Sequence, residues 1–369
     1  MHLFSKKKNY IFIVSNSLWS IHNFRSELIY ALKKKEYKVI IISFGNKNEK
    51  KFSKIKGEIL QLNKFSLIFF FSLLKLFFYF LKYRPKYVLT FTHIPNIICS
   101  FYSIIFRFNQ ISNLAWGGAD TLPKFYKKIL IFFLKFSFKI SKKTFFQNKD
   151  DLFLFTGKKN TDNSSFEVLP GSGLTRFSFL KNNFPHNLKK EINIINVSRL
   201  IPTKGLIYFC EAAKIIKTKY MINLNFFIQS SFKFDKELNN FEKTIFNYHN
   251  KKYVQILPFK KELRKLYRDM DIAVCTSIRE GTPRFLIEAI SCGLPIISSN
   301  VPGCNEICIK NYNGYLFNYG DVNDLVKKIL KLINLNLFQI TKFKKNSYRL
   351  FCHKYEINYV LNSYLRNIK

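Results

Sequence analysis

Acidic residues are scarce in this chain. It has 23 Asp and Glu against 61 Lys and Arg, which gives a formal net charge of +38 over 369 residues. Such an excess attracts polyanions, namely nucleic acid, an anionic membrane face or a phosphorylated substrate, and charge alone does not select among them. Lys, Asn, Ile, Phe and Tyr are over-used together, which A/T-rich codons would also produce. Selection for a partner and codon drift therefore both stay open as the origin of the charge.

Paired cysteines and an export signal are also lacking. The seven cysteines are scattered without a C-x-x-C pair, and most lie in apolar runs, which is typical of a reducing cytosol. The basic N-terminus is followed by an apolar stretch that is too short for a signal peptide, because polar residues interrupt it at 15–17. We therefore expect a cytoplasmic protein.

Two segments are apolar enough to be mistaken for membrane spans. The segment 65–81 contains Lys75 and is shorter than the roughly 20 residues of a span, which favours a buried or interfacial helix. The segment 124–143 has phenylalanines and isoleucines around most of its helical circumference. Its lysines share one helical face: Lys124, Lys128, Lys135, Lys139 and Lys142. It is either a helix lying on the inner face of the cell membrane or a surface helix with its apolar side on a sheet.

Short apolar runs alternate with amphipathic stretches and polar turns along the chain, which predicts parallel sheets with crossover helices. In the first half, a helix is expected over 22–34, and the expected strands are 10–14, 39–42, 87–91, 111–116 and 143–146. In the second half, the expected strands are 192–197, 224–228, 253–257, 272–275 and 295–297. The string PGSG and a polar stretch at 182–187 lie between the halves. The chain therefore contains two α/β units of similar build.

The segment 279–300, REGTPRFLIEAISCGLPIISSN, is the strongest candidate for chemistry. It follows an expected strand, and Pro283 suits the first turn of a helix, where its missing N–H costs nothing. Backbone N–H groups at this helix start, with Gly281 allowing close approach, favour a bound phosphate. Glu280 lies in the loop and Glu288 in the helix, so one carboxylate can reach a sugar and the other a ribose.

A second junction of strand, loop and helix lies at 193–205, NIINVSRLIPTKG. Arg199 follows the expected strand and Lys204 precedes a glycine. A guanidinium binds phosphate oxygens with a planar fork, and an ammonium adds a compact charge, so this pair suits a diphosphate leaving group.

These segments resemble the donor-site signature of family-four retaining glycosyltransferases with the GT-B fold. An E-x7-E spacing lies within EGTPRFLIEAISCGLPIISS, VPGCNEI and NGYLF follow it, and SRLIPTKGL is similar to the family's R-x4-K-G segment. TFFQNKDDLFLF and LPGSGLTRF resemble the close of the family's first domain, especially in bacterial enzymes that build polysaccharide or lipid-linked oligosaccharide. YEINYVLNSYLRN resembles its closing helix, so the likeness covers nearly the whole chain.

The resemblance implies an α/β architecture of two Rossmann-like domains facing a central cleft, with a C-terminal helix packing back on the first domain. The expected domains are an acceptor-binding domain at 1–180, a nucleotide-sugar-binding domain at 181–345 and the returning helix at 346–369.

The resemblance also implies roles for individual residues. Arg199 and Lys204 would bind the nucleotide diphosphate, Glu280 would contact the transferred sugar, and these three are the expected catalytic residues. Glu288 would accept hydrogen bonds from the ribose hydroxyls. Other residues would line the phosphate and sugar: Gly281, Thr282, Pro283, Arg284 and Phe285.

Three positions depart from the family's pattern. After the first strand, many relatives have a glycine-rich loop, where this chain has Asn-Ser-Leu at 16–18. Many relatives also have a His where this chain has Ala-Trp-Gly-Gly at 115–118. The Asp that usually follows LPGSG is Thr175 here. Asp120 is the candidate for the acceptor-side role of the missing His. We expect the change at Thr175 to affect the domain hinge rather than the chemistry.

The remaining acceptor-side candidates are histidines and an arginine of the first half. His93 ends an expected strand, where open α/β sheets place ligand groups, although it can equally bond a neighbouring loop. His22 and Arg25 open the first expected helix and face either the cleft or the solvent. The D-x-D string at 269–271 precedes a strand and lies away from the signature loop, so we predict no required metal.

The sequence thus predicts an enzyme, a retaining hexosyl- or N-acetylhexosaminyltransferase using a nucleotide sugar. The resemblance suggests a UDP-sugar as co-substrate, no further cofactor, a polysaccharide or lipid-linked acceptor, and contact with an anionic membrane surface. One alternative is a basic nucleic-acid-binding protein, although no recognised module is present and the basic residues are spread along the chain. The other is a catalytically inactive scaffold on the same fold.

Overall fold

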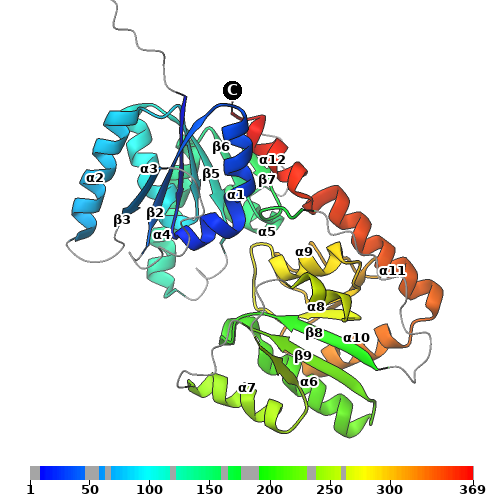
Figure 1. Cartoon of the computed structure of the whole chain (residues 1–369). Coiled ribbons are helices and arrows are strands. Elements are labelled where there is room, and N and C mark those ends of the chain that lie inside the picture. The colour runs from blue at the N-terminus through cyan, green and yellow to red at the C-terminus, as the bar shows by residue number, and fades with distance from the viewer. Residues whose placement is uncertain are drawn as a thin grey trace, which may run out of the picture. The chain divides into compact units, whose positions relative to one another are not determined.

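The computed structural model describes residues 9–45, 58–62, 68–116, 122–158, 165–175, 191–230, 238–258 and 263–368. The chain divides into two compact units. The first unit is formed by Met1–Gly173 with Ile357–Lys369, and the second by Leu174–Glu356 (Figure 1). Each unit is built on one parallel sheet with crossover helices, so the predicted α/β class is confirmed.

The first unit has a seven-stranded sheet in the order β3-β2-β1-β4-β5-β6-β7. Its strands are β1 (Tyr10–Ser15), β2 (Lys38–Phe44), β3 (Glu58–Leu62), β4 (Tyr87–Phe91), β5 (Asn109–Leu114), β6 (Lys143–Phe146) and β7 (Phe166–Val168). Its helices are α1 (Leu18–Lys34), α2 (Ile68–Tyr83), α3 (His93–Phe106), α4 (Lys124–Ile140), α5 (Lys149–Thr156) and α12 (Ile357–Leu365).

Both faces of this sheet are buried, because successive side chains of each strand point to opposite sides. On β1, Ile11 and Ile13 pack with α1 and α12, whereas Phe12 and Val14 pack with α2 and α3. Leu114 at the end of β5 packs with α4 and α5 on the same side as α2 and α3. The helices therefore form two layers, α1 with α12 on one side and α2 to α5 on the other.

The C-terminal helix belongs to the first unit, as the fold class predicted. The Tyr364 side chain of α12 is buried, and the Asn113 amide donates a hydrogen bond of 2.9 Å to its hydroxyl. The returning segment begins at Ile357. Tyr355, two residues earlier, belongs to the second unit, where its carbonyl accepts a hydrogen bond of 3.0 Å from the backbone N–H of Leu174. Residues 346–356, assigned to the returning helix by sequence, lie in the second unit.

The second unit has a six-stranded sheet in the order β10-β9-β8-β11-β12-β13. Its strands are β8 (Ile192–Val197), β9 (Leu224–Gln229), β10 (Gln255–Leu257), β11 (Ile272–Cys275), β12 (Ile296–Ser299) and β13 (Gly314–Phe317). Its helices are α6 (Leu206–Lys219), α7 (Asn240–Asn250), α8 (Arg264–Arg268), α9 (Arg284–Ser291), α10 (Val322–Ile333) and α11 (Leu337–Leu350). A 3₁₀ turn at Pro202–Lys204 precedes α6, and a π-helical turn at Phe351–Tyr355 follows α11.

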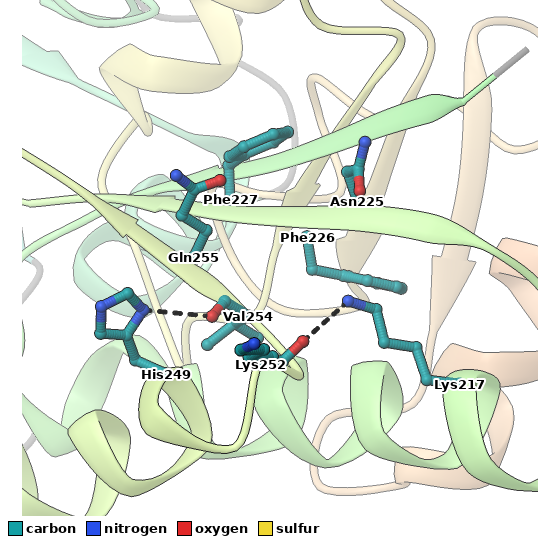
Figure 2. Close-up of a pocket in the computed structure, with 8 residues that line it drawn as sticks. All are labelled: Lys217, Asn225, Phe226, Phe227, His249, Lys252, Val254 and Gln255. Atoms are coloured by element: carbon teal, nitrogen blue, oxygen red, sulfur yellow. Dashed lines mark hydrogen bonds between the residues drawn. The ribbon is translucent and has the colours of Figure 1, made fainter.

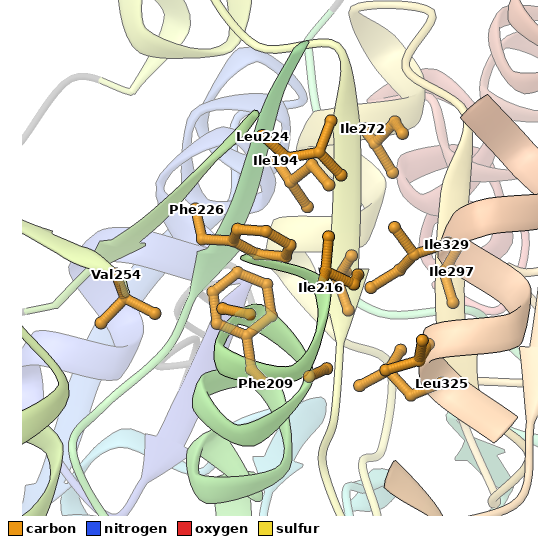
Figure 3. Packing of buried hydrophobic residues seen from close by; sticks show 14 of the residues in the cluster. Ile194, Phe209, Ile216, Leu224, Phe226, Val254, Ile272, Ile297, Leu325 and Ile329 are labelled. Atoms are coloured by element: carbon orange, nitrogen blue, oxygen red, sulfur yellow. The ribbon is translucent and has the colours of Figure 1, made fainter. Parts of the chain in front are cut away.

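Large apolar side chains fasten these helices to the sheet. Figure 3 shows Phe209 of α6 against Phe226 of β9, with their ring centroids 5.5 Å apart. Ile329 of α10 belongs to the same buried cluster and is fully buried. Rigid packing of this kind fixes the strand ends from which the functional loops emerge.

Each sheet has a point at which the strand order reverses. In the first unit it lies between β1 and β4, and in the second unit between β8 and β11. Ligands of open parallel sheets bind outside the carboxyl ends of the strands at such a point. The loops that follow these four strands are therefore the places to look for a site.

Candidate active site

The two predicted donor segments lie side by side at the reversal point of the second unit. Strands β8 and β11 are neighbours, with Ile194 in register with Ile272. The loop after β11 bonds directly to the loop after β8, because the Thr276 hydroxyl donates to the carbonyl of Lys204 at 2.9 Å. The backbone N–H of Ile278 also donates to the carbonyl of Thr203 at 3.1 Å. Segments far apart in the sequence therefore form one site.

Gly205 makes this close approach possible. Its φ is +61°, and a Cβ atom added there would lie 2.1 Å from the carbonyl oxygen of Thr276. No side chain fits in that space, so the glycine after Lys204 is a requirement of the loop contact. The chain then enters α6 directly, which fixes Lys204 at the carboxyl end of the sheet.

Lys204 and Glu280, two of the predicted catalytic residues, form an ion pair across the two loops. Their side chains are only 17% and 18% exposed, so water screens the interaction weakly. The Ser277 hydroxyl donates to the same carboxylate oxygen of Glu280 at 2.7 Å. The carboxylate is thus held in one orientation by a cation and a hydroxyl.

Arg199, the third predicted catalytic residue, lies on the loop after β8 and is exposed. Its guanidinium has no side-chain partner among the residues that the structure describes. Its donors can therefore bind an anion at the reversal point without breaking an existing ion pair.

The signature helix begins one residue later than predicted. Pro283 is the N-cap residue of α9, with an extended backbone, and Arg284 is the first helical residue. The prediction that Pro283 lies inside the first turn was wrong. Its carbonyl accepts from the backbone N–H groups of Leu286 and Ile287, but its own backbone is extended, as is usual for an N-cap residue. Of the other predicted donor residues, Gly281 and Phe285 are buried and Thr282 is half-buried.

Glu288 is oriented by two donors from its own unit. The Arg284 guanidinium donates to one carboxylate oxygen at 3.0 Å, and the Tyr267 hydroxyl donates to the other at 3.0 Å. Burial and the neighbouring Glu288 raise the pKa of Tyr267 well above its ordinary value, so this hydroxyl stays a neutral donor. A carboxylate accepts up to about four hydrogen bonds, so Glu288 keeps capacity for further donors.

A third loop, after β12, supports the signature loop. Gly303 has a φ of +80°, and a Cβ atom there would lie 2.3 Å from the carbonyl oxygen of Glu280. The backbone N–H of Glu280 donates to the carbonyl of Pro302 at 3.2 Å. VPGCNEI contributes to the family resemblance, but no local pattern marks Ser277, Tyr267 or Gly303 as functional. Only the fold brings these residues against the two glutamates.

At the reversal point of the first unit, His93 is the first residue of α3. Its ring lies edge to face with that of Trp116, with centroids 5.4 Å apart. Thr92, just before it, has φ 75° and ψ 179°, a region that is almost restricted to glycine. Buried Thr92 Oγ1 and Asn16 Oδ1 have no hydrogen-bond partner within the described ranges. Strain and unpaired polar atoms of this kind concentrate at binding sites.

The other acceptor-side candidates are placed differently from the prediction. Helix α1 begins at Leu18, so His22 and Arg25 lie inside the helix instead of opening it. Arg25 is 8% exposed, and its guanidinium carbon lies 4.1 Å from the centroid of the Phe91 ring. The alternative of a surface position is therefore wrong for Arg25. Asp120 lies outside the described residues.

The D-x-D string lies at the amino ends of β8 and β11, away from the signature loops. The buried Asp271 carboxylate accepts a hydrogen bond of 3.0 Å from the backbone N–H of Asn193. The carbonyl of Asp269 accepts one of 2.8 Å from the Asn193 amide. Across the part of the chain that the structure describes, no group of three or more His, Cys, Asp or Glu is arranged to hold a metal ion.

A cavity of about 300 Å³ opens at the same amino-terminal side, on β9 and β10 (Figure 2). The ammonium of Lys217 donates to the carbonyl of Lys252 at 3.0 Å across it. The residues around it are Lys217, Asn225, Phe226, Phe227, His249, Lys252, Val254 and Gln255. This cavity lies at the opposite end of the strands from Lys204 and Glu280, so it is separate from the predicted donor segments.

Residues 178–349 match the family described as glycosyl transferases group 1. The match covers a little under half of the chain. The match contains both predicted donor segments and both glutamates, and the predicted resemblance to family-four GT-B glycosyltransferases is confirmed.

Two bacterial enzymes that are similar to this chain are named as glycosyltransferases. An Escherichia coli UDP-Gal:alpha-D-GlcNAc-diphosphoundecaprenol alpha-1,3-galactosyltransferase is 31% identical over 39% of this chain and 37% of its own length. The chain thus matches little more than a third of that enzyme. A Campylobacter jejuni N,N'-diacetylbacillosaminyl-diphospho-undecaprenol alpha-1,3-N-acetylgalactosaminyltransferase is 25% identical over 94% of this chain and 95% of its own length.

The whole chain shares its fold with solved GT-B structures. Anabaena HepE, solved in complex with UDP and glucose, superposes with a TM-score of 0.75 at 14% identity, covering 97% of this chain and 99% of its own. Both Rossmann-like units are included in that coverage, so the predicted GT-B fold is confirmed.

Proposed function

We propose that the protein is a glycosyltransferase that moves a sugar from a nucleotide sugar to a lipid-linked or polysaccharide acceptor, with retention of anomeric configuration. The observation that carries the proposal is the pairing of Lys204 with Glu280 at the reversal point of a group 1 glycosyltransferase unit. A UDP-sugar donor is supported by the UDP named for HepE and for the E. coli relative. A diphosphoundecaprenol-linked acceptor is supported by the names of both bacterial relatives.

In this proposal the nucleotide diphosphate binds between the loops after β8 and β11. Arg199 supplies a planar guanidinium, and Lys204 shares its three ammonium donors between Glu280 and a phosphate oxygen. The backbone N–H groups at the start of α9 add partial positive charge near the same phosphates. Glu288, already oriented by Tyr267, accepts from the ribose hydroxyls.

The proposed reaction needs no protein nucleophile. The acceptor hydroxyl oxygen forms a bond to the anomeric carbon on the face from which the diphosphate departs, while the bond from that carbon to the diphosphate oxygen breaks. The departing phosphate oxygen takes the proton of the hydroxyl. Negative charge grows on the diphosphate, and Arg199 and Lys204 stabilise it; preoriented donors of this kind contribute roughly 3–4 kcal/mol each to lowering a barrier. Glu280, fixed by Lys204 and Ser277, contacts the sugar.

We place the acceptor group at the reversal point of the first unit. The strained Thr92, with its unpaired hydroxyl oxygen, and the neighbouring His93 support this placement. Asn16 Oδ1, on the loop after the adjacent β1, adds a second unpaired polar atom. These atoms are suited to hydrogen bonds with a sugar hydroxyl or a phosphate of the acceptor.

A screen of nucleotide sugars by thermal unfolding tests the donor half of the proposal. A ligand that binds only the folded protein raises the melting temperature, by an amount set by the ratio of its concentration to its dissociation constant. We expect a UDP-sugar to stabilise the protein and to be consumed when an undecaprenyl-diphosphate-linked sugar is supplied. Stabilisation without consumption of the donor over a panel of acceptors would favour the inactive scaffold. The absence of stabilisation by any nucleotide sugar would refute the donor site.

A further inference from the structure

The first unit carries an apolar and basic surface that the proposed chemistry does not use. It lies on helices α2, α3 and α4, on the side of the sheet away from α1 and α12 (Figure 1). We call it the α2–α4 face and define it by these exposed side chains: Phe70, Phe71, Leu74, Phe78, Leu81, Phe101, Ile104, Ile105, Phe125, Tyr126, Ile129, Phe132 and Phe133.

The three helices form one continuous surface. The Tyr102 hydroxyl of α3 donates to the carbonyl of Leu73 in α2 at 2.9 Å. On the other side of α3, the ring of Phe101 lies with its centroid 5.5 Å from that of Phe136 in α4. Monomeric soluble proteins rarely leave so many large apolar side chains exposed together, so the face is suited to contact with an apolar partner.

Helix α4 is fastened to the unit by a narrow strip. Only Leu134, Ser137 and Phe138 of this helix are buried, and the Ser137 hydroxyl donates to the carbonyl of Asn96 at 2.8 Å. Phe125 and Phe132, by contrast, are each 69% exposed. Part of the apolar side thus packs on the sheet, as one interpretation predicted, whereas three of the five phenylalanines of α4 are exposed.

The charge on these helices has one sign. None of the three helices contains Asp or Glu. Their basic residues are Lys75, Lys82, Lys124, Lys127, Lys128, Lys135 and Lys139. Phenylalanines interleaved with lysines complement an anionic bilayer, whose acyl boundary accepts rings and whose phosphates accept ammonium groups.

We propose that the α2–α4 face docks on an anionic phospholipid bilayer, with its phenylalanines in the interface and its lysines at the lipid phosphates. Pairing with a second copy of the chain is disfavoured, because it would bring two sets of lysines together without carboxylates. Docking is peripheral: no described helix is long and apolar enough to cross a membrane. That docking would bring the protein to a lipid-linked acceptor rests on the proposed function. The docking itself does not depend on that function.

Sedimentation with vesicles tests the charge component of the proposal. The full chain, without nucleotide, is mixed with phosphatidylcholine vesicles that contain either no anionic lipid or about 30% phosphatidylglycerol. We expect tight binding only to the anionic vesicles. The variant Lys128→Gln/Lys135→Gln/Lys139→Gln should bind them roughly a hundredfold more weakly, since each lysine near such a surface contributes about fivefold. The matched control is Lys327→Gln/Lys342→Gln/Lys345→Gln, which removes the same charge from exposed positions of α10 and α11 and should bind like wild type.

A second pair of variants tests the apolar component. Phe125→Ser/Phe132→Ser should bind anionic vesicles about tenfold or more weakly, since two rings no longer enter the interface. Its control is Tyr30→Ser/Phe338→Ser, at positions 68% and 76% exposed on α1 and α11, which should leave binding unchanged. All variants should melt near the wild-type temperature, because the substituted side chains are exposed.

The outcomes separate docking from the proposed function. Wild-type protein that fails to bind anionic vesicles would overturn the docking proposal, and so would equal losses in the face and control variants. A wild-type dimer in analytical ultracentrifugation that Phe125→Ser/Phe132→Ser dissociates would assign the face to self-association instead. Stabilisation by a UDP-sugar, measured without vesicles, should persist in every variant. If a UDP-sugar does not stabilise even the wild-type protein, the donor site is contradicted, whereas the docking proposal is unaffected.

Discussion

Replacement of Lys204 tests whether this residue binds the diphosphate or only holds Glu280. In Lys204→Ala we expect turnover to fall by about 10²–10³-fold, the usual effect of losing one preoriented donor at a developing negative charge. The broken ion pair is mostly shielded from water, at 17% and 18% exposure, so unfolding should become easier by roughly 1–3 kcal/mol. A loss of that size leaves a domain of ordinary stability folded at 25 °C, since such domains are stable by about 5–15 kcal/mol.

Glu280→Gln separates the two roles of the lysine. It removes the charge partner of Lys204 but keeps the ammonium, so UDP alone should stabilise this variant as well as it stabilises wild type. UDP should stabilise Lys204→Ala far less. Both variants should lose transfer, because the sugar contact proposed for Glu280 is disturbed in each. The assays are melting temperature with and without UDP, and consumption of a UDP-sugar with an acceptor.

Lys328→Ala is the matched control for an ion pair in the same unit. Lys328 pairs with Asp324 at 3.1 Å on α10, with side chains 29% and 17% exposed. This variant should lose at most about 0.5 kcal/mol of stability and none of its response to UDP. The reasoning is refuted if Lys204→Ala keeps the wild-type response to UDP, or if Lys204→Ala and Glu280→Gln lose that response equally.

Two further predictions concern residues that support the site, and a third concerns the cysteines. Tyr267→Phe should weaken UDP binding several-fold with the fold intact, since Glu288 loses a donor worth about 1–2 kcal/mol. Calorimetric titration with UDP measures this effect, and an unchanged affinity would contradict the prediction. Gly303→Ala should lower the melting temperature by several degrees or prevent folding, because its Cβ would meet the carbonyl oxygen of Glu280. Gly157→Ala, at φ +70° with open space, should cost only about 1 kcal/mol, and equal losses in both variants would refute the steric argument. A thiol reagent should label Cys352 first, because the other cysteines are buried. Burial raises the pKa of Cys292 to about 11, so roughly one Cys292 side chain in a thousand is a thiolate at pH 8. Labelling of Cys292, followed by mass spectrometry, should therefore rise with pH up to about 11. Fast labelling of Cys292 near neutral pH would contradict its buried position.

Short strands at the edges of the sheets escaped the sequence analysis. β3, β7 and β13 are the strands that it did not predict, and each lies at an edge, whereas the edge strand β10 was predicted. An edge strand needs only a few residues and one covered side, so its apolar pattern is weak. The interior strands were predicted because residues such as Ile11 to Val14 are buried on both faces and form continuous apolar runs.

The sequence by itself determined the α/β class, the interior strands and the two segments proposed to bind the donor, because burial on both faces and strand–loop–helix junctions leave a local pattern. Only the tertiary structure decided what those segments contact. The pairing of Lys204 with Glu280, the support of Glu280 by Ser277 and the buried position of Arg25 all depend on which strands are neighbours. The outward turn of the phenylalanines on α4 was also undecided by sequence. An amphipathic pattern tells which residues share a helical face, whereas the sheet and the neighbouring helices determine which face is covered.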